Sequence, residues 1–287
     1  MWLILALGSA LFAGVTAVLA KAGIQDTDSH LATALRTGVV LVFSWLIVFL
    51  TGVQTQLFAI RKVAWISLVL SGLATGGSWL CYFRALQLGD VHKVVFVDKS
   101  STVLTMLLAF LVLQEPLTWM KAVGMAAIAG GTWLMMYRPG ANVPENKQKH
   151  GWLLWAFGSA LCASLAALLS KWGMQEIDSH LGTAVRTVVV LVMAWGLVFL
   201  LKRHKQVRQI STKSWVFLFL SGIATGLSWL CYFRALQLGP MSVVVPVDKL
   251  SILVTVILSH TLLREKLSLR GWFGLGIMTA GTLCLLW

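Results

Sequence analysis

One stretch of sequence, which occurs twice, decides the fold. Ser71–Gly89 reads SGLATGGSWLCYFRALQLG and Ser221–Gly239 reads SGIATGLSWLCYFRALQLG, with differences at only two positions. Shifting the chain by 150 positions aligns the rest of the two halves without a gap, which indicates an internal duplication. We therefore expect two copies of one unit, at residues 1–137 and 151–287, joined by a polar linker at 138–150.

The composition indicates a membrane protein. Hydrophobic residues make up 58% of the 287 and charged residues only 11%, and the mean hydropathy of +0.84 is high for a soluble domain. A helix needs about 20 apolar residues to cross a hydrocarbon core about 30 Å thick. Ten such runs are present, at residues 2–20, 33–51, 64–86, 92–113, 119–137, 151–170, 182–201, 214–236, 241–263 and 270–287. Because no segment alternates apolar and polar residues as a membrane barrel does, we expect an all-α integral membrane fold.

The odd number of spans in each unit fixes how the two copies are related. A unit of five spans leaves the membrane on the face opposite to the one it entered, so the second copy starts from the far face. We therefore expect ten transmembrane helices arranged as two inverted five-helix repeats. Such repeats are common in secondary transporters, which hold substrate near the midplane between the repeats. The alternative is that the duplication only records the history of a membrane scaffold.

The formal charge of +13 does not indicate nucleic-acid binding, because the cations lie in short loops and at span ends. One face carries most of them, in the linker, in the loop KRHKQVRQISTK at 202–213 and near residues 264–270. The counterpart loop in the first copy, TGVQTQLFAIRK, is far less basic. The positive-inside rule places the basic face in the cytoplasm, and both termini then lie outside.

No metal site or cofactor is expected from the sequence. The cysteines fall inside predicted spans without the spacing of metal ligands, which favours a packing role; they are Cys81, Cys162, Cys231 and Cys284. Asp-Ser-His occurs at 28–30 and again at 178–180, but inversion places the two clusters on opposite faces, so helix capping is the better interpretation. The chain has no GxxxxGK[ST] motif for ATP, so an ion or substrate gradient would have to supply energy.

Ionisable residues inside the spans are candidates for function, because a charge is costly in lipid. Asp98 and Lys99, repeated as Asp248 and Lys249, lie roughly 10 Å below the membrane surface at the rise of a helix. Adjacent helical residues do not face each other, so each Asp and its neighbouring Lys need partners on other helices. The predicted partners are Arg84, Arg234, Lys21 and Lys171. A substrate or proton site is one interpretation, and ion pairs that fix the bundle are the other.

Further polar residues of the spans suggest a cavity and its gates. The third span and its copy carry a polar and aromatic surface that either lines a cavity or packs on a neighbour: Ser78, Trp79, Tyr82, Ser228, Trp229 and Tyr232. Arg36 and Arg186 either snorkel to the interface, which is the favoured interpretation, or clamp a substrate. Together with Lys21 and Lys171, these two arginines are the predicted clamp or gate residues.

The fourth and ninth spans carry a proline in one copy and an acid at the end of both copies. Pro246 replaces Phe96 of the first copy, which predicts a kink in the ninth span only. Glu115 and Glu265 fall where the fourth and ninth spans end, and either make a helix-end or gate contact or are solvated loop acids.

A set of motifs recurs in the same order in both halves. They are an early Gly-Ser-Ala helix, an arginine in the second span (ATALRT and GTAVRT), YFRAL closing the third span, and an acid followed by Gly-Thr, as in Glu115 with Gly131-Thr132 and Glu265 with Gly281-Thr282. This pattern resembles the EamA family of the drug/metabolite transporter superfamily over essentially the whole chain. The resemblance implies a non-enzymatic carrier of the plasma (inner) membrane, with helices around a central cavity. Family members usually place both termini inside, contrary to the charge pattern.

The variant motifs VDKSS and VPVDKLS resemble a subgroup of that family which includes single-copy chains of half this length. Such half-length chains would have to pair antiparallel, as the two halves are expected to do here.

The sequence thus predicts a secondary transporter, an exporter or exchanger that moves a small polar metabolite such as an amino acid or an organic anion by alternating access. The alternative is translocation of a lipid-linked phosphate across the bilayer. An enzyme is not expected, because no nucleophile with a base, metal cluster or phosphate loop is present. The expected partners are a small-molecule substrate, membrane lipid and, for coupling, protons, in a monomer or homodimer.

Overall fold

The computed structural model describes residues 1–23, 27–89, 91–136, 151–262 and 268–286, and within these ranges all regular structure is helical. The α-helices are α1 (Trp2–Gly23), α2 (Ser29–Leu50), α3 (Lys62–Leu88), α4 (Val91–Lys99), α5 (Ser101–Val112), α6 (Trp119–Met136), α7 (Trp152–Gly173), α8 (Ser179–Leu200), α9 (Thr212–Leu238), α10 (Met241–Asp248), α11 (Ser251–Leu262) and α12 (Leu269–Cys284). Two short 3₁₀ helices, η1 (Val53–Ala59) and η3 (Arg203–Gln209), follow α2 and α8.

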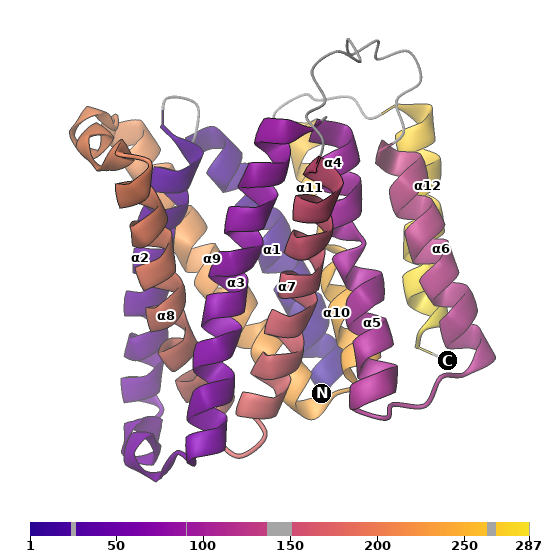
Figure 1. The fold of residues 1–287 in the computed structure, drawn as a ribbon, viewed down its shortest axis with the longest axis horizontal. Coiled ribbons are helices and arrows are strands. Elements are labelled where there is room, and N and C mark those ends of the chain that lie inside the picture. Colours follow the sequence, from indigo (N-terminus) through magenta and orange to yellow (C-terminus); the bar gives the residue numbers. More distant parts are fainter. Residues whose placement is uncertain (24–26, 90, 137–150, 263–267, 287) are drawn as a thin grey trace.

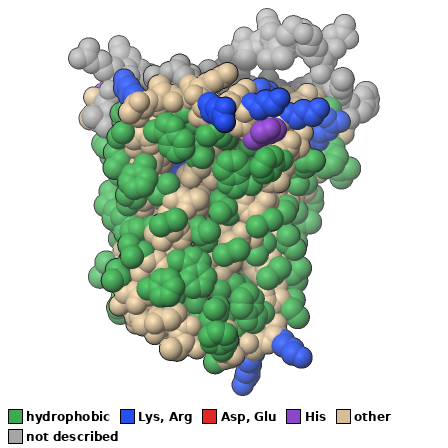
Figure 2. Space-filling view, turned by 90° about the vertical axis from the view of Figure 1, so that its left-hand side faces the viewer, with side chains coloured by type: hydrophobic (Ala, Val, Ile, Leu, Met, Phe, Trp, Pro, Cys, Tyr) green, Lys and Arg blue, Asp and Glu red, His purple; other side chains and the backbone are tan. Residues whose placement is uncertain are grey.

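The long helices have the length and surface of membrane spans. Eight described segments are long and apolar enough to cross a bilayer. Their outward faces are apolar, as in α2, where Val42, Leu46 and Phe49 are 72%, 51% and 61% exposed. Figure 2 shows hydrophobic side chains over the middle of one side of the molecule, with Lys and Arg at its two ends. The shorter helices α6 and α12 are not among the eight segments, so the count of ten crossings stays a prediction.

Equivalent helices of the two halves run in opposite directions. In Figure 1 α1 starts at the lower face and α7 at the upper face, and η1 lies at the lower face while η3 lies at the upper. We call these faces the η1 face and the η3 face. The halves interlock, because α3 packs on α7, α1 on α9, α2 on α8 and α6 on α12. The predicted all-α membrane fold of inverted repeats is therefore confirmed.

Glycines let helices of different halves approach closely. A Cβ atom added to Gly72 of α3 would lie 2.6 Å from the Cβ of Val189 in α8, and one added to Gly222 of α9 would lie 2.6 Å from the Cβ of Val39 in α2. Small residues permit such close crossings in membranes. The polar face of the third span and its copy was predicted either to line a cavity or to pack on a neighbour. Its glycines pack on a neighbouring helix.

The fourth and ninth spans are both interrupted just after the repeated Asp-Lys pair, between α4 and α5 and between α10 and α11. In the ninth span, Pro246 precedes a tightened turn in which the Lys249 amide donates to the Pro246 carbonyl at 3.0 Å. The prediction of a break in this span alone is wrong. The fourth span is interrupted at the equivalent place without a proline, and there the Ser100 hydroxyl donates to the Val97 carbonyl at 2.6 Å.

The repeated Asp-Ser-His segments cap helices, as predicted. The Asp28 carboxylate accepts from the His30 amide at 3.0 Å at the start of α2, and the Asp178 carboxylate accepts from the His180 amide at 2.8 Å at the start of α8.

The two halves are not packed alike near the two faces. Phe233, Leu236, Ser179 and Arg186 towards the η1 face are buried, whereas their counterparts Phe83, Leu86, Ser29 and Arg36 towards the η3 face are half-buried or exposed. The described part of the molecule is therefore closed more tightly at the η1 face than at the η3 face.

Candidate functional site

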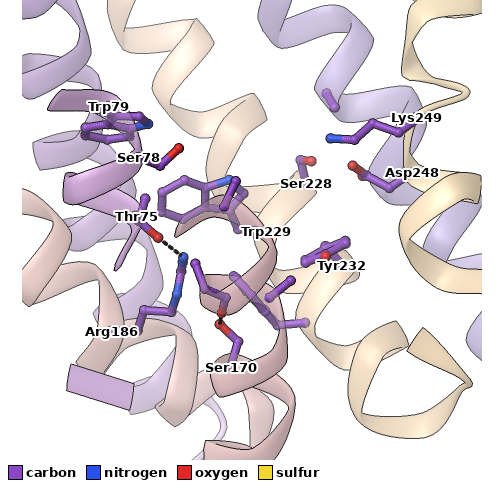
Figure 3. A pocket seen from close by; sticks show the side chains of 15 residues that line it. Thr75, Ser78, Trp79, Ser170, Arg186, Ser228, Trp229, Tyr232, Asp248 and Lys249 are labelled. Atoms are coloured by element: carbon purple, nitrogen blue, oxygen red, sulfur yellow. Dashed lines mark hydrogen bonds between the residues drawn. The ribbon is translucent and has the colours of Figure 1, made fainter. Parts of the chain in front are cut away.

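A cavity of about 290 Å³ lies between the two halves, at the small end of the range for ligand cavities. Its walls come from α1 and α3 of the first half and from α7 to α10 of the second. The polar and charged side chains that line it are Thr75, Ser78, Ser170, Arg186, Ser228, Tyr232, Asp248 and Lys249, and the aromatic ones include Trp79, Trp229 and Phe233. In Figure 3 Arg186 lies on one side of Trp229, and Asp248 and Lys249 lie on the other.

The two intramembrane aspartates are held by serines. The Asp248 carboxylate accepts from the Ser9 hydroxyl of α1 at 2.5 Å, and the Asp98 carboxylate accepts from the Ser159 hydroxyl of α7 at 2.7 Å. These two bonds are equivalent under the repeat and each joins the halves. Asp248 lines the cavity, whereas Asp98 is not among the residues that line it.

The two intramembrane lysines lie close to each other beside the helix interruptions. Lys99 and Lys249 are within electrostatic range and together line a smaller space bounded by α6 and α12. The Lys99 ammonium is 4.0 Å from the Asp98 carboxylate, at the outer limit of an ion pair, as expected for adjacent helical residues. The Lys99 side chain is 42% accessible although it lies within a span, so the surrounding helices do not enclose it completely.

Arg186 enters the cavity from α8 and is only 5% exposed. Its Nε donates to the Ser71 hydroxyl at 2.9 Å and its Nη2 to the Thr75 hydroxyl at 2.6 Å. The guanidinium carbon lies 4.7 Å from the ring centroid of Phe233 and 5.5 Å from that of Trp229. The favoured prediction that Arg186 snorkels to the interface is therefore wrong, because its charged group is buried among α3 and α9.

Other predicted site residues lie away from the cavity. Tyr82 packs against buried residues of α3, α4 and α7, and Arg84 bonds to Gln87 within α3 at 3.0 Å. Arg234 bonds to Gln237 at 2.7 Å and lies 3.8 Å from Asp178, and Lys171 contacts Glu115. Arg36 has its Nη1 3.5 Å from the Ser221 hydroxyl, and Lys21 is an exposed residue of α1. The predicted pairing of the buried aspartates with Arg84, Arg234 or Lys171 is thus wrong, since serines satisfy the carboxylates instead.

Glu115 joins the loop after α5 to α7 and α10 at the η1 face. Its carboxylate accepts from the backbone amides of Met241 and Ser242, at 2.6 and 2.9 Å, in the first turn of α10. The Lys171 ammonium lies 3.5 Å from this carboxylate and also donates to the Gly239 carbonyl at 2.7 Å. Burial disfavours the charged form, but the hydrogen bonds from Ser242 and Met241 and the Lys171 charge outweigh it and lower the pKa of Glu115. Of its predicted roles, the helix-end contact is confirmed, whereas Glu265 lies outside the described residues.

A second group of contacts closes the same face. The Gln237 side-chain amide donates to the carbonyls of Met174 and Ile177, at 2.5 and 2.7 Å, in the connection between α7 and α8. Gln237 lies in the last turn of α9, so these bonds tie the end of α9 to the connection between α7 and α8.

Sequence reasoning missed the two serines that hold the intramembrane aspartates. Ser9 and Ser159 are small residues within apolar helices, and nothing in the local pattern distinguishes a packing serine from one that binds a carboxylate. The repeat offered the available signal, because Ser9 and Ser159 occupy equivalent positions. Within the described ranges, no group of three or more His, Cys, Asp or Glu residues is placed to hold a metal ion.

Comparison with known proteins assigns the family. The model of the EamA-like transporter family matches residues 1–137 and again residues 150–287. The chain belongs to the EamA-like transporter family. A relative from Sinorhizobium sp, described as an uncharacterized transporter in the cobO 3′ region, is 43% identical over 134 residues, which make up 47% of this chain and 95% of the relative. This EamA-like chain is therefore a multi-pass membrane transporter, and one of its halves matches nearly the full length of that relative.

A solved crystal structure, described only as that of a protein, has the same fold as this EamA-like chain. The two superpose with a TM-score of 0.74 over 97% of this chain and 94% of the other, at 16% sequence identity. A likeness at this identity concerns the fold alone.

Proposed function

We propose that the protein is a secondary transporter, an exporter or exchanger, that moves a small polar metabolite such as an amino acid or an organic anion. The observation that carries this proposal is a charged cavity between inverted halves, closed more tightly at one face than at the other. Inverted repeats around a midplane site allow alternating access, because exchanging the conformations of the two halves exchanges the open face. The tight packing at the η1 face supports a state that opens towards the η3 face.

The charges of the cavity favour an anion or a zwitterion. Its described lining holds two cations, Arg186 and Lys249, and one carboxylate, Asp248. Tyr232 lies within electrostatic range of both Asp248 and Arg186, so groups of opposite charge are available at separate points of one small cavity. A carboxylate held close to a cation can also exchange a proton as its surroundings change, which makes Asp248 the proposed coupling residue.

The charge distribution supports a location in the plasma (inner) membrane with the η3 face in the cytoplasm. η3 contains Arg203, Lys205 and Arg208, whereas η1 contains no cation and is followed by only Arg61 and Lys62. In this orientation the proposed state faces inward and both termini lie outside.

Translocation of a lipid-linked phosphate is the second candidate function. Lys99 and Lys249 line a space beside α6 and α12, at the edge of the molecule in Figure 1, where a phosphate group attached to a lipid would find two cations.

Reconstitution into liposomes tests the proposal. Purified protein is expected to exchange radiolabelled amino acids or organic acids across the bilayer above the level of protein-free liposomes. Asp248→Asn is expected to reduce this exchange by about tenfold or more, whereas Lys213→Gln, a change at an exposed residue, leaves it unchanged. No solute exchange, together with movement of a fluorescent lipid phosphate between leaflets, would favour the second function.

A further inference from the structure

Arg186 has an unusual set of neighbours for a buried cation. Its side chain is almost fully buried inside a membrane span, where an isolated charge costs several kcal/mol. No acidic side chain in the described part of the chain forms an ion pair with it. Its two hydrogen-bond acceptors are the neutral hydroxyls of Ser71 and Thr75.

One donor group of Arg186 has no acceptor at all. The Nη1 atom is buried and makes no hydrogen bond within the described residues. Nε and Nη2 are held by α3, and the aromatic rings of Phe233 and Trp229 lie against the guanidinium, so its position is fixed. Arg186 lines the cavity, and Nη1 is the donor of this cation that has no acceptor within the described residues. Because Nη1 itself has almost no accessible surface, a ligand in the cavity would reach it only when a neighbouring side chain moves aside. A ligand that accepts a hydrogen bond and carries negative charge would satisfy both the donor and the charge.

The equivalent residue of the other half is placed differently. Arg36 is half-buried rather than buried, and its one hydrogen bond in the described structure is the long 3.5 Å contact to Ser221. It does not line the cavity. A buried guanidinium with one unpaired buried donor therefore occurs at Arg186 and not at Arg36 in the described structure.

The residues around Arg186 indicate what kind of molecule would carry the anionic group. The cavity is small, and alanines of α7 and the rings of Trp79, Trp229 and Phe233 form much of its surface. These walls suit a compact apolar or aromatic body better than a highly hydroxylated or multiply charged one. A single carboxylate supplies the one negative charge that Arg186 lacks.

Building on the proposed transport function, we propose that Arg186 is the substrate anchor, and that the substrate is a small monocarboxylate with a compact apolar or aromatic body. The carboxylate accepts a hydrogen bond from Nη1 of Arg186, and the body lies against Trp229 and Phe233. An amino acid and a simple organic acid share this group, and Asp248 near the other end of the cavity favours the amino acid by accepting its ammonium group.

Binding to the detergent-solubilised full chain tests the anchor without depending on transport. Matched probes are phenylacetate with phenylacetamide, and L-leucine with L-leucinamide, measured by calorimetry or by the shift in the unfolding temperature. The carboxylates are expected to bind about tenfold or more tightly than their amides, because a charge-assisted hydrogen bond is lost in the amide. Stronger binding of leucine than of phenylacetate would identify the amino acid as the source of the carboxylate.

Variants then assign the preference to Arg186. Arg186→Gln is expected to remove the preference for carboxylate over amide, and Arg186→Lys to retain part of it. Arg208→Gln, at an exposed arginine of η3, should leave it unchanged. If Arg186→Gln does not fold, the comparison of carboxylates with amides on the wild-type chain still tests the anchor. Phe233→Leu, which removes one ring from the guanidinium, is then expected to weaken carboxylate binding, and unchanged binding in this variant would argue against the anchor.

Two results separate the anchor from the transport proposal. If liposomes exchange solute but the wild-type chain binds amides as well as carboxylates, or Arg186→Gln keeps the preference, the anchor is wrong and transport stands. If carboxylates bind with the stated preference but no solute is exchanged, the transport proposal fails and the anchor stands.

Discussion

Gly72 has no room for a methyl group, whereas Gly38, also in the middle of a helix, has nothing within 4 Å of an added Cβ atom. Gly72→Ala is expected to destabilise the protein by about 1–3 kcal/mol, because the Cβ would overlap Val189 of α8. Gly38→Ala is the matched control and should stabilise by about 0.5–1 kcal/mol through its effect on helix formation. Thermal unfolding in detergent measures both, and equal shifts for the two variants would contradict the close crossing of α3 and α8.

At the scale of residues, the sequence pointed to charged groups within the spans but not to their neighbours. The cost of a charge in lipid singled out Asp98, Lys99, Asp248 and Lys249, and the repeat paired them. It did not predict their partners, because a serine of another helix is identified only when the helices are packed. The same holds for Arg186, whose burial depends on α3 and α9 closing over it.

At the scale of elements, the contact between Glu115 and α10 is expected to make the stability of the η1 face depend on pH. The pKa of this carboxyl is lowered from its ordinary value of 4.5 in the folded protein. Its stabilising effect is therefore fully present above about pH 4.5 and is lost as the pH falls through the lower folded value.

A pair of variants tests this pH dependence. Glu115→Gln should lower the unfolding free energy by roughly 1–3 kcal/mol at neutral pH, and the difference from wild type should shrink below pH 4.5. Glu176→Gln is the control on the same face, because its partner Arg61 is 77% exposed and such pairs contribute little. A difference between wild type and Glu115→Gln that does not change with pH would exclude an ionised Glu115 as the cause.

The packing of α3 on α7 can be tested with native cysteines. The Cys162 sulfur lies 3.8 Å from a Cβ added to Gly77, and the Cys81 sulfur lies 3.6 Å from one added to Gly158, so the two thiols lie on one helix contact. With a protease site inserted into the linker, a short bifunctional thiol reagent is expected to keep the two halves joined after cleavage. Cys81→Ala should abolish the joined product, and its persistence in that variant would argue against this contact.

Sequence periodicity predicted the long helices but not every interruption. Pro246 suggested a break in the ninth span because proline lacks an amide donor and clashes with the preceding turn. The interruption instead follows Pro246 and occurs at the equivalent place in the fourth span, which has no proline. Ser100 gives no such signal, since a serine within a helix often bonds back to its own backbone without ending the helix. Its effect depends on the turn that the surrounding helices permit.

At the scale of the whole molecule, inversion predicts which positions are accessible from which side of the membrane. Ser29 and Gln175 are exposed at opposite faces. In a background without the native cysteines, Ser29→Cys is expected to react with an impermeant thiol reagent from the cytoplasm and Gln175→Cys from outside. Reversed results would change only the orientation, whereas reaction of both from one compartment would contradict the inverted repeats.

The overall fold was the most predictable feature. Apolar runs of the right length and a gapless repeat with an odd number of spans leave few arrangements, because lipid excludes unpaired backbone groups. The tighter closure of one face was not predictable, since two related sequences with the same pattern of spans do not indicate which conformation each half adopts.

Because the two inverted halves are joined in one chain, each half can change in sequence without the other. In a pair of identical half-length subunits, each substitution changes both ends of the permeation path at once. Here Arg186 and Arg36, or the loops at 202–213 and 51–62, can diverge independently. If the proposed alternating access holds, the affinity for substrate on each side of the membrane can therefore evolve separately.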